Sequence, residues 1–183
     1  SVPGACVANG IVVRRDLSEN GKVRYVSDLK GRKVMASSDQ DYSIFLALAL
    51  GNLTKDDIET VPLDYPSGII ALKNGAVDAA VLVEPYTTQA LDNDTAVLLV
   101  SANEYSPYMP NPLYYGPAFL DKDPELGRRF LVAYLKGVKQ YNEGKTEQNL
   151  VILSNYTRLD RKLLNKTCWV PITSNGTVKR QPV

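Results

Sequence analysis

One stretch of sixteen residues, ALKNGAVDAAVLVEPY from Ala71 to Tyr86, constrains the fold of this chain more than any other. It opens with good helix formers and reaches Gly75, where the end of a helix favours a residue that can adopt positive φ. An apolar run follows at 77–83, interrupted by a single acid, Asp78, as in a strand that is covered on both faces. Glu84 comes directly after that run, at the end of a strand where open α/β sheets bind ligands. The stretch therefore predicts a helix, a buried strand and a ligand site in succession.

The same order of elements recurs through the first two thirds of the chain. Ser38 is placed to cap one helix, with Asp41 completing a capping box, and Ser67 is placed to cap the next. Pro85 suits the first position of a third helix. Strands that alternate with helices predict parallel pairing with right-handed crossovers, and hence one α/β lobe at 17–112. The expected strands are 33–37, 58–63, 77–83 and 96–100.

Beyond residue 117 the pattern becomes helical. Asp123 and Pro124 favour the start of a long helix that Gly144 would end, and Thr146 favours the start of another. The apolar stripes of these helices need a sheet to cover, and 11–13 and 113–119 are the candidate strands. Two strands make a poor sheet, so the sequence predicts only part of a second lobe.

Composition excludes several classes of function. The 183 residues carry 21 basic and 20 acidic side chains, so no basic surplus points to nucleic acid or to an anionic membrane. No apolar run approaches the roughly 20 residues that span a bilayer. The chain has no histidine, which removes Ser-His-Asp and Cys-His triads and histidine metal sites. The commonest general base is therefore absent from the chain as well.

Two features depend on the compartment in which the chain folds. Cys6 and Cys168 are too few for a structural zinc site, and they form either one long-range disulfide or two free thiols. Five N-x-Ser/Thr sequons would be meaningful only in a eukaryotic secreted chain. The sequons begin at Asn52, Asn93, Asn155, Asn165 and Asn175.

Six short motifs occur in an order that identifies a family resemblance. They are 27–34 (SDLKGRKV), Ser37-Ser38, 71–79 (ALKNGAVDA), 84–86 (EPY), 123–126 (DPEL) and 169–176 (WVPITSNG). In this order the chain resembles the periplasmic substrate-binding proteins of ABC transporters, and most of all the group that handles nitrate, sulfonates, taurine and thiamine-pyrimidine or flavin compounds. Asp78 recurs in the family's motif, and we expect it to bond backbone rather than to act in a site.

The resemblance implies a type II periplasmic-binding-protein fold: a parallel-rich sheet flanked by helices, in two lobes that close on a ligand. The chain would cross between lobes at 12–16 and at 113–118. Residues 17–112 would form the complete lobe, while 1–16 and 113–183 would supply hinge strands and the C-terminal half of the other lobe. The family's N-terminal strands have no counterpart here, so we expect a second copy to cover the apolar stripe around Phe130 and Tyr134.

The resemblance also implies a role and a place. The role is that of a solute receptor, so we expect neither catalysis nor a cofactor or metal. The expected partners are a small-molecule ligand and an ABC permease in the membrane, with no nucleic acid. The expected location is periplasmic or extracytoplasmic, either lipoprotein-tethered or soluble. Two other functions on this fold remain as alternatives. A ligand-sensing regulatory domain would need a signalling segment, which is not visible. A thiamine-pyrimidine synthase-like enzyme uses pyridoxal phosphate and consumes a histidine, which this chain lacks.

Candidate ligand contacts lie where helices begin, because free N–H groups and a partial positive charge gather there. Ser38 and Ser67 could equally be plain caps. Glu84 could cap the helix that follows it, or its carboxylate could accept from an amine, amide or ring N–H. Tyrosines could stack on a flat heteroaromatic ring. The candidates are Ser37, Ser38, Asp39, Gln40, Tyr42, Tyr65, Ser67, Glu84, Tyr86 and Tyr115.

The ligand class follows from Glu84. If its carboxylate faced the ligand, small anions such as nitrate or sulfonate would bury like charges together. The sequence therefore favours a neutral or cationic nitrogen heterocycle, such as a pyrimidine or a flavin precursor.

Overall fold

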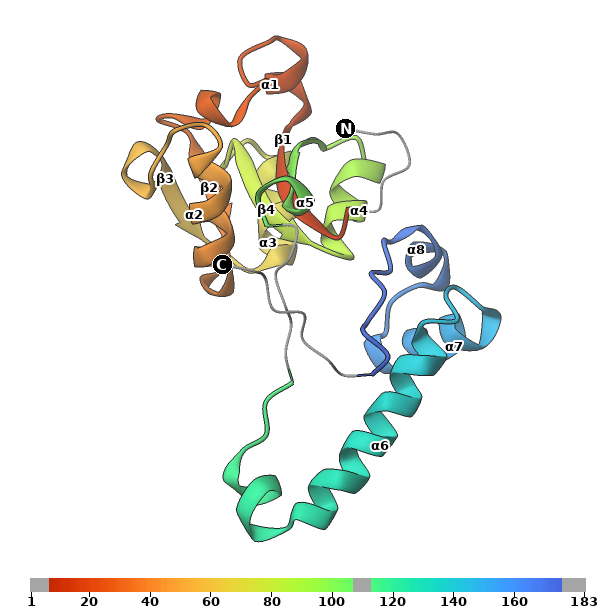
Figure 1. Cartoon of the computed structure of the whole chain (residues 1–183). Coiled ribbons are helices and arrows are strands. Elements are labelled where there is room, and N and C mark those ends of the chain that lie inside the picture. Colours follow the sequence, from red (N-terminus) through yellow and green to blue (C-terminus); the bar gives the residue numbers. More distant parts are fainter. Residues whose placement is uncertain (1–6, 107–112, 176–183) are drawn as a thin grey trace. The chain divides into compact units, whose positions relative to one another are not determined.

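The computed structural model describes residues 7–106 and 113–175, and it divides the chain into two compact units. The first unit holds the described residues up to 106 together with Lys166–Cys168, and the second holds the remainder. Figure 1 shows the sheet of the first unit and the helices of the second. Each unit is described by itself below.

A five-stranded sheet in the order β3-β2-β4-β1-β5 forms the centre of the first unit. β2 pairs in parallel with β3 and with β4, whereas β1 lies antiparallel between β4 and β5. Four strands thus run in one direction and β1 runs against them. The strands are β1 (Asn9–Arg14), β2 (Lys33–Ala36), β3 (Glu59–Pro62), β4 (Ala79–Val83) and β5 (Ala96–Ser101).

Helices cover both faces of this sheet (Figure 1). Alternate strand residues point to opposite faces. Val81 of β4 packs in the cluster that includes Ile44 and Leu48 of α2, whereas Leu82 packs in the cluster that includes Leu72 of α3. The helical segments are α1 (Arg15–Glu19), η1 (Val26–Leu29), η2 (Ser38–Gln40), α2 (Asp41–Ala49), η3 (Lys55–Asp57), α3 (Tyr65–Lys73), α4 (Tyr86–Asp92) and α5 (Ala102–Tyr105).

The first unit has an α/β architecture where the sequence predicts a lobe at 17–112, and its sheet includes one further strand, β1. The expected start of that lobe was residue 17, and 12–16 was assigned to a crossing between lobes. In the structure β1 lies inside the sheet, between β4 and β5. This position buries Ile11 and Val13 in the core on one face of the sheet and Val12 in the core on the other face. The four strands expected in the lobe share one direction, and β1, which the sequence placed outside the lobe, runs against them. Asp78 accepts a hydrogen bond from the Lys33 backbone N–H at 3.1 Å, as expected of a carboxylate that bonds backbone.

Two helix starts differ from the sequence prediction. α3 is capped by Asp64, whose carboxylate accepts the Ser67 N–H at 2.8 Å, so Ser67 lies inside the first turn rather than at the cap. Ser38 begins a 3-10 turn, η2, and α2 starts three residues later at Asp41. Asp64 takes the cap because its extended backbone leads straight from β3 into the helix.

The described part of the second unit is helical. The expected strand at 113–119 is absent there, and 118–122 instead forms a short π-helix, η4, before α6. As predicted, Asp123 caps α6 and Thr146 caps α7. Asp123 accepts the Leu126 N–H at 2.8 Å, and Thr146 accepts the Asn149 N–H at 3.2 Å. The elements are η4 (Ala118–Lys122), α6 (Pro124–Tyr141), α7 (Glu147–Thr157) and α8 (Arg161–Lys166).

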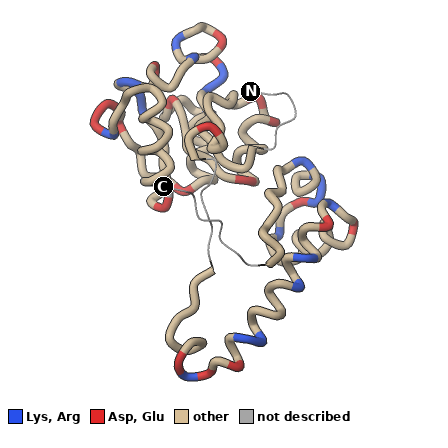
Figure 2. The backbone as a smooth tube through the Cα atoms, viewed as in Figure 1, with Lys and Arg blue, Asp and Glu red and all other residues tan. Residues whose placement is uncertain are grey.

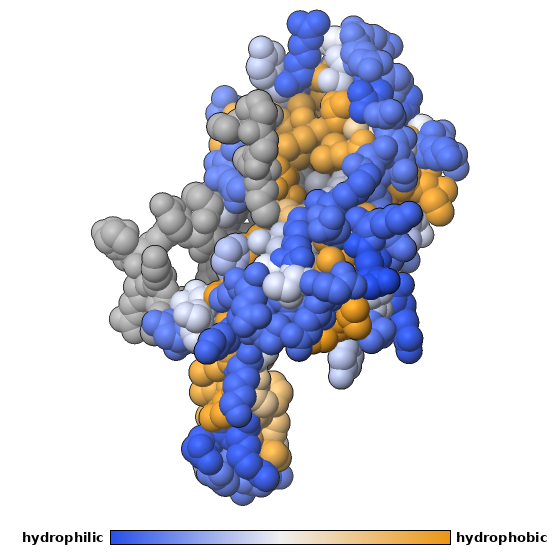
Figure 3. All heavy atoms as spheres, turned by 90° about the vertical axis from the view of Figure 1, so that its right-hand side faces the viewer, coloured by the Kyte–Doolittle hydropathy of each residue, from blue (hydrophilic) through white to orange (hydrophobic). Residues whose placement is uncertain are grey.

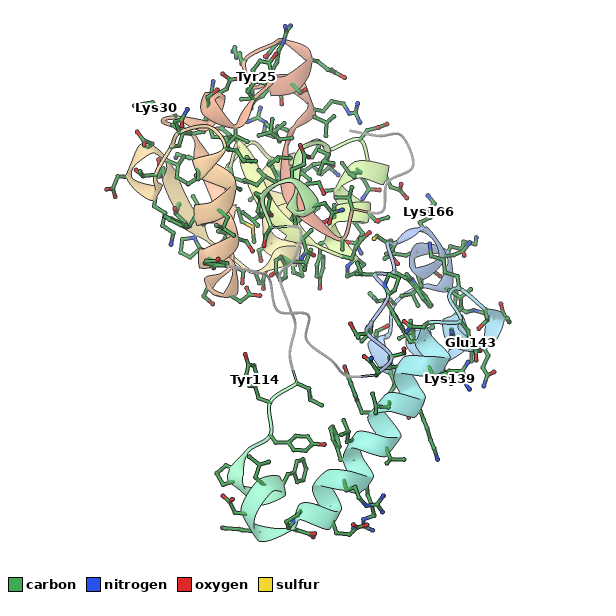
Figure 4. The ribbon with its side chains drawn as sticks, in the orientation of Figure 1. Tyr25, Lys30, Tyr114, Lys139, Glu143 and Lys166 are labelled. Atoms are coloured by element: carbon green, nitrogen blue, oxygen red, sulfur yellow. The ribbon has the colours of Figure 1, made fainter. Side chains whose placement is uncertain are left out.

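An aromatic cluster joins η4 to α6. Tyr115, Phe119 and Phe130 have ring centroids 5.4–6.1 Å apart, and the Tyr115 hydroxyl donates to the Gly127 carbonyl at 2.7 Å. Phe130 is still 40% exposed, and Tyr114 is 84% exposed. Tyr114 is labelled in Figure 4, where its side chain projects away from the backbone. Figure 3 shows the resulting apolar surface along the arm that η4 and α6 form.

Charges are interspersed over the described residues of both units, without a large field of one sign (Figure 2). None of the helices described is both long and apolar enough to cross a membrane.

Candidate functional site

The carboxyl ends of β2, β3 and β4 meet at one edge of the sheet, because these strands are adjacent and parallel. The chain leaves β2 into Ser37 and η2, leaves β3 toward Tyr65, and leaves β4 into Glu84. This edge is where open α/β sheets bind ligands. We call the group Ser37, Ser38, Asp39, Tyr65, Glu84 and Tyr86 the corner.

Three side chains of the corner are brought together by direct contacts. The Tyr65 hydroxyl donates to the Asp39 carboxylate, at 3.2 Å from one oxygen and 3.0 Å from the other. The Tyr65 and Tyr86 rings stack, with centroids 5.3 Å apart and planes 18° from parallel. Residues separated by up to 47 positions in sequence therefore form one half-buried aromatic surface that ends in an exposed carboxylate.

Glu84 is held within the first unit by three donors. One carboxylate oxygen accepts the Thr88 backbone N–H at 3.1 Å, and the other accepts the Thr88 hydroxyl and the Cys168 backbone N–H, both at 2.7 Å. The carboxylate thus bonds the first turn of α4 and fastens Cys168 to the strand end. These three bonds occupy much of the hydrogen-bonding capacity that a ligand would use.

The remaining candidates do not gather at the corner. Tyr42 is 62% exposed on α2, and the Ser67 N–H is bound to Asp64. Gln40 lies at the end of η2, and its side chain is outside the described residues. Tyr115 belongs to the aromatic cluster of the second unit.

This edge of the sheet carries acidic side chains, among them Asp64 and Glu84. Hydrogen bonds from the Ser67 hydroxyl and the Ser67 backbone N–H hold the pKa of Asp64 below its ordinary value. Asp64 and Glu84 thus occupy the first turns of α3 and α4 with the protein's own carboxylates. Among the described residues no group of three or more His, Cys, Asp or Glu could hold a metal ion.

Sequence reasoning missed two parts of this arrangement. Asp64 stands three residues before Ser67, which is the spacing of a cap and the N–H that it accepts, so the signal was present. Cys168 gave no signal as a partner of Glu84, because the two are 84 residues apart. Cys168 is disulfide-bonded, and the chain's one other cysteine, Cys6, lies outside the described residues.

Two open hollows are found elsewhere. One, of about 420 Å³, lies in the first unit and includes Arg24, Tyr25 and Gly51 in its lining. The other, of about 350 Å³, lies in the second unit between α7 and α8. Neither is lined by a residue of the corner.

Comparison with known proteins gives consistent matches. A provisionally named aliphatic sulfonates-binding protein of Bacillus subtilis (strain 168) is 28% identical over 159 residues, which cover 86% of this chain and 46% of that protein. The alkanesulfonate-binding protein SsuA from Xanthomonas axonopodis pv. citri, solved with MOPS bound, superposes with a TM-score of 0.72 at 17% identity, covering 90% of this chain and 56% of its own. The desulfurization enzyme DSZB superposes with a TM-score of 0.64 at 14% identity, covering 97% of this chain and 65% of its own.

The two structural matches are too low in identity to show more than a shared fold. They do confirm the predicted fold class: the α/β architecture of periplasmic binding proteins, here with helices on both faces of a five-stranded sheet. The chain spans about half the length of the curated relative and of the sulfonate-binding structure. The model of the family described as "NMT1/THI5 like" matches residues 8–144, which is most of the chain, and the chain therefore belongs to the NMT1/THI5-like family.

Proposed function

We propose that this chain is part of an extracytoplasmic solute-binding receptor of an ABC importer, and that the corner contacts the ligand. The observation that carries the proposal is the meeting of Asp39, Tyr65 and Tyr86 at the carboxyl ends of three adjacent strands. Family membership and the names of the relatives support the receptor role. Cys168, being disulfide-bonded, supports an oxidising compartment outside the cytoplasm.

The first candidate ligand is a small organic sulfonate. The sequence argued against anions on the ground that Glu84 would face the ligand, but its oxygens accept three hydrogen bonds from Thr88 and Cys168. That objection loses its basis. Ser37 and Ser38 lie at the same edge and offer hydroxyl donors suited to an anionic head group.

The second candidate is the nitrogen heterocycle that the sequence favours. Asp39 supports it, because an exposed carboxylate repels a sulfonate and attracts a ring or amine N–H. The stacked rings of Tyr65 and Tyr86 offer a flat surface on which a heteroaromatic ring can lie. The relatives reported above carry names that refer to sulfonates, so this candidate stands second.

A non-catalytic role fits the chain better than an enzymatic one. DSZB shows that the fold can carry an enzyme, so the fold alone does not decide. The relative with the higher identity is named as a binding protein, and the chain has no histidine to act as a general base. A regulatory domain remains the alternative on the same fold.

The test is a thermal-shift screen of the purified chain against taurine, nitrate, hydroxymethylpyrimidine and riboflavin, followed by calorimetry on any compound that protects it. Protection by taurine alone supports the sulfonate, because a ligand that binds only the native state raises the melting temperature. Protection by the pyrimidine or the flavin alone replaces it with the heterocycle. Turnover of any of the four compounds would overturn the receptor role itself.

Two partner proposals accompany this function. The receptor would deliver its ligand to a permease in the membrane. The apolar stripe of α6, on which Phe130 is 40% exposed, would be covered by a second copy of the chain. Light scattering that gives the mass of one chain would refute the second copy.

A further inference from the structure

In this chain a threonine stands two positions after an asparagine far more often than chance predicts. With twelve asparagines and ten threonines in 183 residues, random order would give fewer than one Asn-x-Thr triplet, whereas the chain holds five. None of the five has proline at its middle position, which is the residue that blocks N-glycosylation. The excess needs an explanation that the proposed binding function does not provide.

The structure meets the first physical condition for such sites. All five sequon asparagines are exposed: Asn52, Asn93, Asn155, Asn165 and Asn175. A sugar chain is bulky and hydrophilic, so its attachment point must reach solvent in the folded protein. Surface exposure alone is common for asparagine, so the hydrogen bonds of the amide groups matter as well.

The fold does not use the amide groups of four of the five sequon asparagines. Those of Asn52, Asn93, Asn155 and Asn165 make no side-chain hydrogen bond to any residue that the structure describes. Asn149, which starts no sequon, is 3% exposed, and its amide nitrogen donates to the carbonyls of Gln140 and Gly144. A sugar on that nitrogen would break both bonds, whereas a sugar on the four sequon amides breaks none.

The two sequons of the first unit also lie away from the corner. α2 and α4 each start at the carboxyl edge of the sheet and run back toward the opposite edge (Figure 1). Asn52 follows the end of α2, and Asn93 caps the end of α4. Asp94, beside Asn93, pairs with Arg15 just beyond the end of the antiparallel β1, at that same opposite edge. Sugars at both positions would leave the corner open.

We propose that these five asparagines are acceptors for N-linked glycans, attached as the chain leaves a cell whose export pathway glycosylates asparagine, whether or not that cell is eukaryotic. The excess of sequons and their exposure thus replace the restriction to a eukaryotic secreted chain that the sequence alone suggests. The amide nitrogen attacks the anomeric carbon of an oligosaccharide carried on a lipid pyrophosphate. The N–C bond forms as the bond from carbon to phosphate oxygen breaks, the lipid pyrophosphate leaves with that electron pair, and the amide proton passes to a base of the transferase. The disulfide at Cys168 agrees with folding in the same oxidising compartment. The proposal is independent of which ligand the corner binds.

The test begins with the protein isolated from its own cells and digested with a peptide N-glycosidase, which hydrolyses the glycosylated amide and converts each sugar-bearing asparagine to aspartate. Peptide mass spectrometry in heavy-oxygen water then marks every converted site. We expect conversion at most of the five sequons and at none of the seven other asparagines. A protein in which most sequon asparagines are unmodified overturns the proposal.

Matched variants separate glycosylation from an effect on folding. Asn93 and Asn74 both cap the end of a helix, with φ of −84° and −88°, but only Asn93 starts a sequon. In a secreting, glycosylating host, Asn93→Gln should lower the apparent mass by one sugar step, and Asn74→Gln should not change it. Thr95→Ser should keep the sugar at Asn93 and Thr95→Val should remove it. Equal apparent mass for all four variants contradicts an acceptor at Asn93.

Discussion

Replacement of Glu84 by alanine tests whether this carboxylate belongs to the fold or to the ligand. Its removal leaves the Thr88 N–H, the Thr88 hydroxyl and the Cys168 N–H without their acceptor. Loss of a helix-start acceptor costs about 1 kcal/mol. Loss of a charge-assisted bond at a half-buried backbone N–H adds about 2 kcal/mol. Glu84→Ala should therefore lower the free energy of unfolding by about 3 kcal/mol, which corresponds to about 6–12 °C in melting temperature for a chain of this size.

The measurement is thermal and urea unfolding of the parent, Glu84→Ala, Glu84→Gln and Glu59→Gln. The glutamine at 84 keeps one oxygen acceptor and should lose roughly half as much stability. Glu59 is an exposed strand residue paired with Lys33 at 3.6 Å, and its variant should stay within about 0.5 kcal/mol of the parent. A Glu84→Ala protein as stable as Glu59→Gln would refute the structural role, and Glu84 would then return as a ligand contact.

Three further perturbations test other parts of the first unit. Tyr65→Phe keeps the ring stacked on Tyr86 but removes the hydrogen bond to Asp39. Calorimetry should show that ligand affinity falls about tenfold, with little change in melting temperature. An unchanged affinity would show that the Tyr65 hydroxyl does not contribute to ligand binding. The folded-state pKa of Asp64 lies below its ordinary 3.8, so the stability that its carboxylate contributes is complete above pH 3.8 and is lost as the pH falls through the lower folded-state pKa. Melting curves recorded at decreasing pH should show this loss in the parent protein. The loss should be smaller in Asp64→Asn, because asparagine still caps the helix but does not titrate. The Tyr105 hydroxyl is buried without a hydrogen-bond partner among the described residues, and burial raises its pKa to about 12. Tyr105→Phe removes this unpaired polar group and should therefore raise the free energy of unfolding, measured by urea titration, by about 1 kcal/mol. A loss of stability would instead show that the hydroxyl has a hydrogen-bond partner.

The fold could be predicted where one local rule decided each element. Strand β4 and the end of α3 followed from an apolar run and Gly75, whose φ of +73° is the conformation that glycine allows. The caps of α6 and α7 followed from Asp123 and Thr146, because a cap depends on residues three positions apart. β1 was misplaced because its apolar run carries no information about direction or partner. Only the pairing of β1 with β4 and β5 determines both, and those strands lie more than 60 residues away.

The candidate site divides in the same way. That Ser37, Tyr65 and Glu84 would reach one edge followed from parallel strands, and the structure brings these positions to that edge. Which side chains touch did not follow. The Tyr65–Asp39 bond and the Tyr65–Tyr86 stack depend on side-chain rotamers at the ends of three strands, and no spacing rule in the sequence specifies these.

Glu84 lies where a ligand contact is expected, but its carboxylate bonds the chain itself. A carboxylate at the end of a buried strand is well placed for a ligand, but the same place puts it beside the exposed N–H groups of the next helix. Those N–H groups are part of the chain, so Thr88 needs no further ordering to reach the carboxylate, whereas a ligand must lose translational freedom to compete. A carboxylate at this position is therefore expected to bond its own helix unless that start is capped otherwise. At α3 the cap comes from Asp64, and at that strand end Tyr65 is left to reach Asp39 and Tyr86. We therefore expect the ligand contacts of the first unit among the side chains that do not cap a helix, such as Tyr65 and Tyr86.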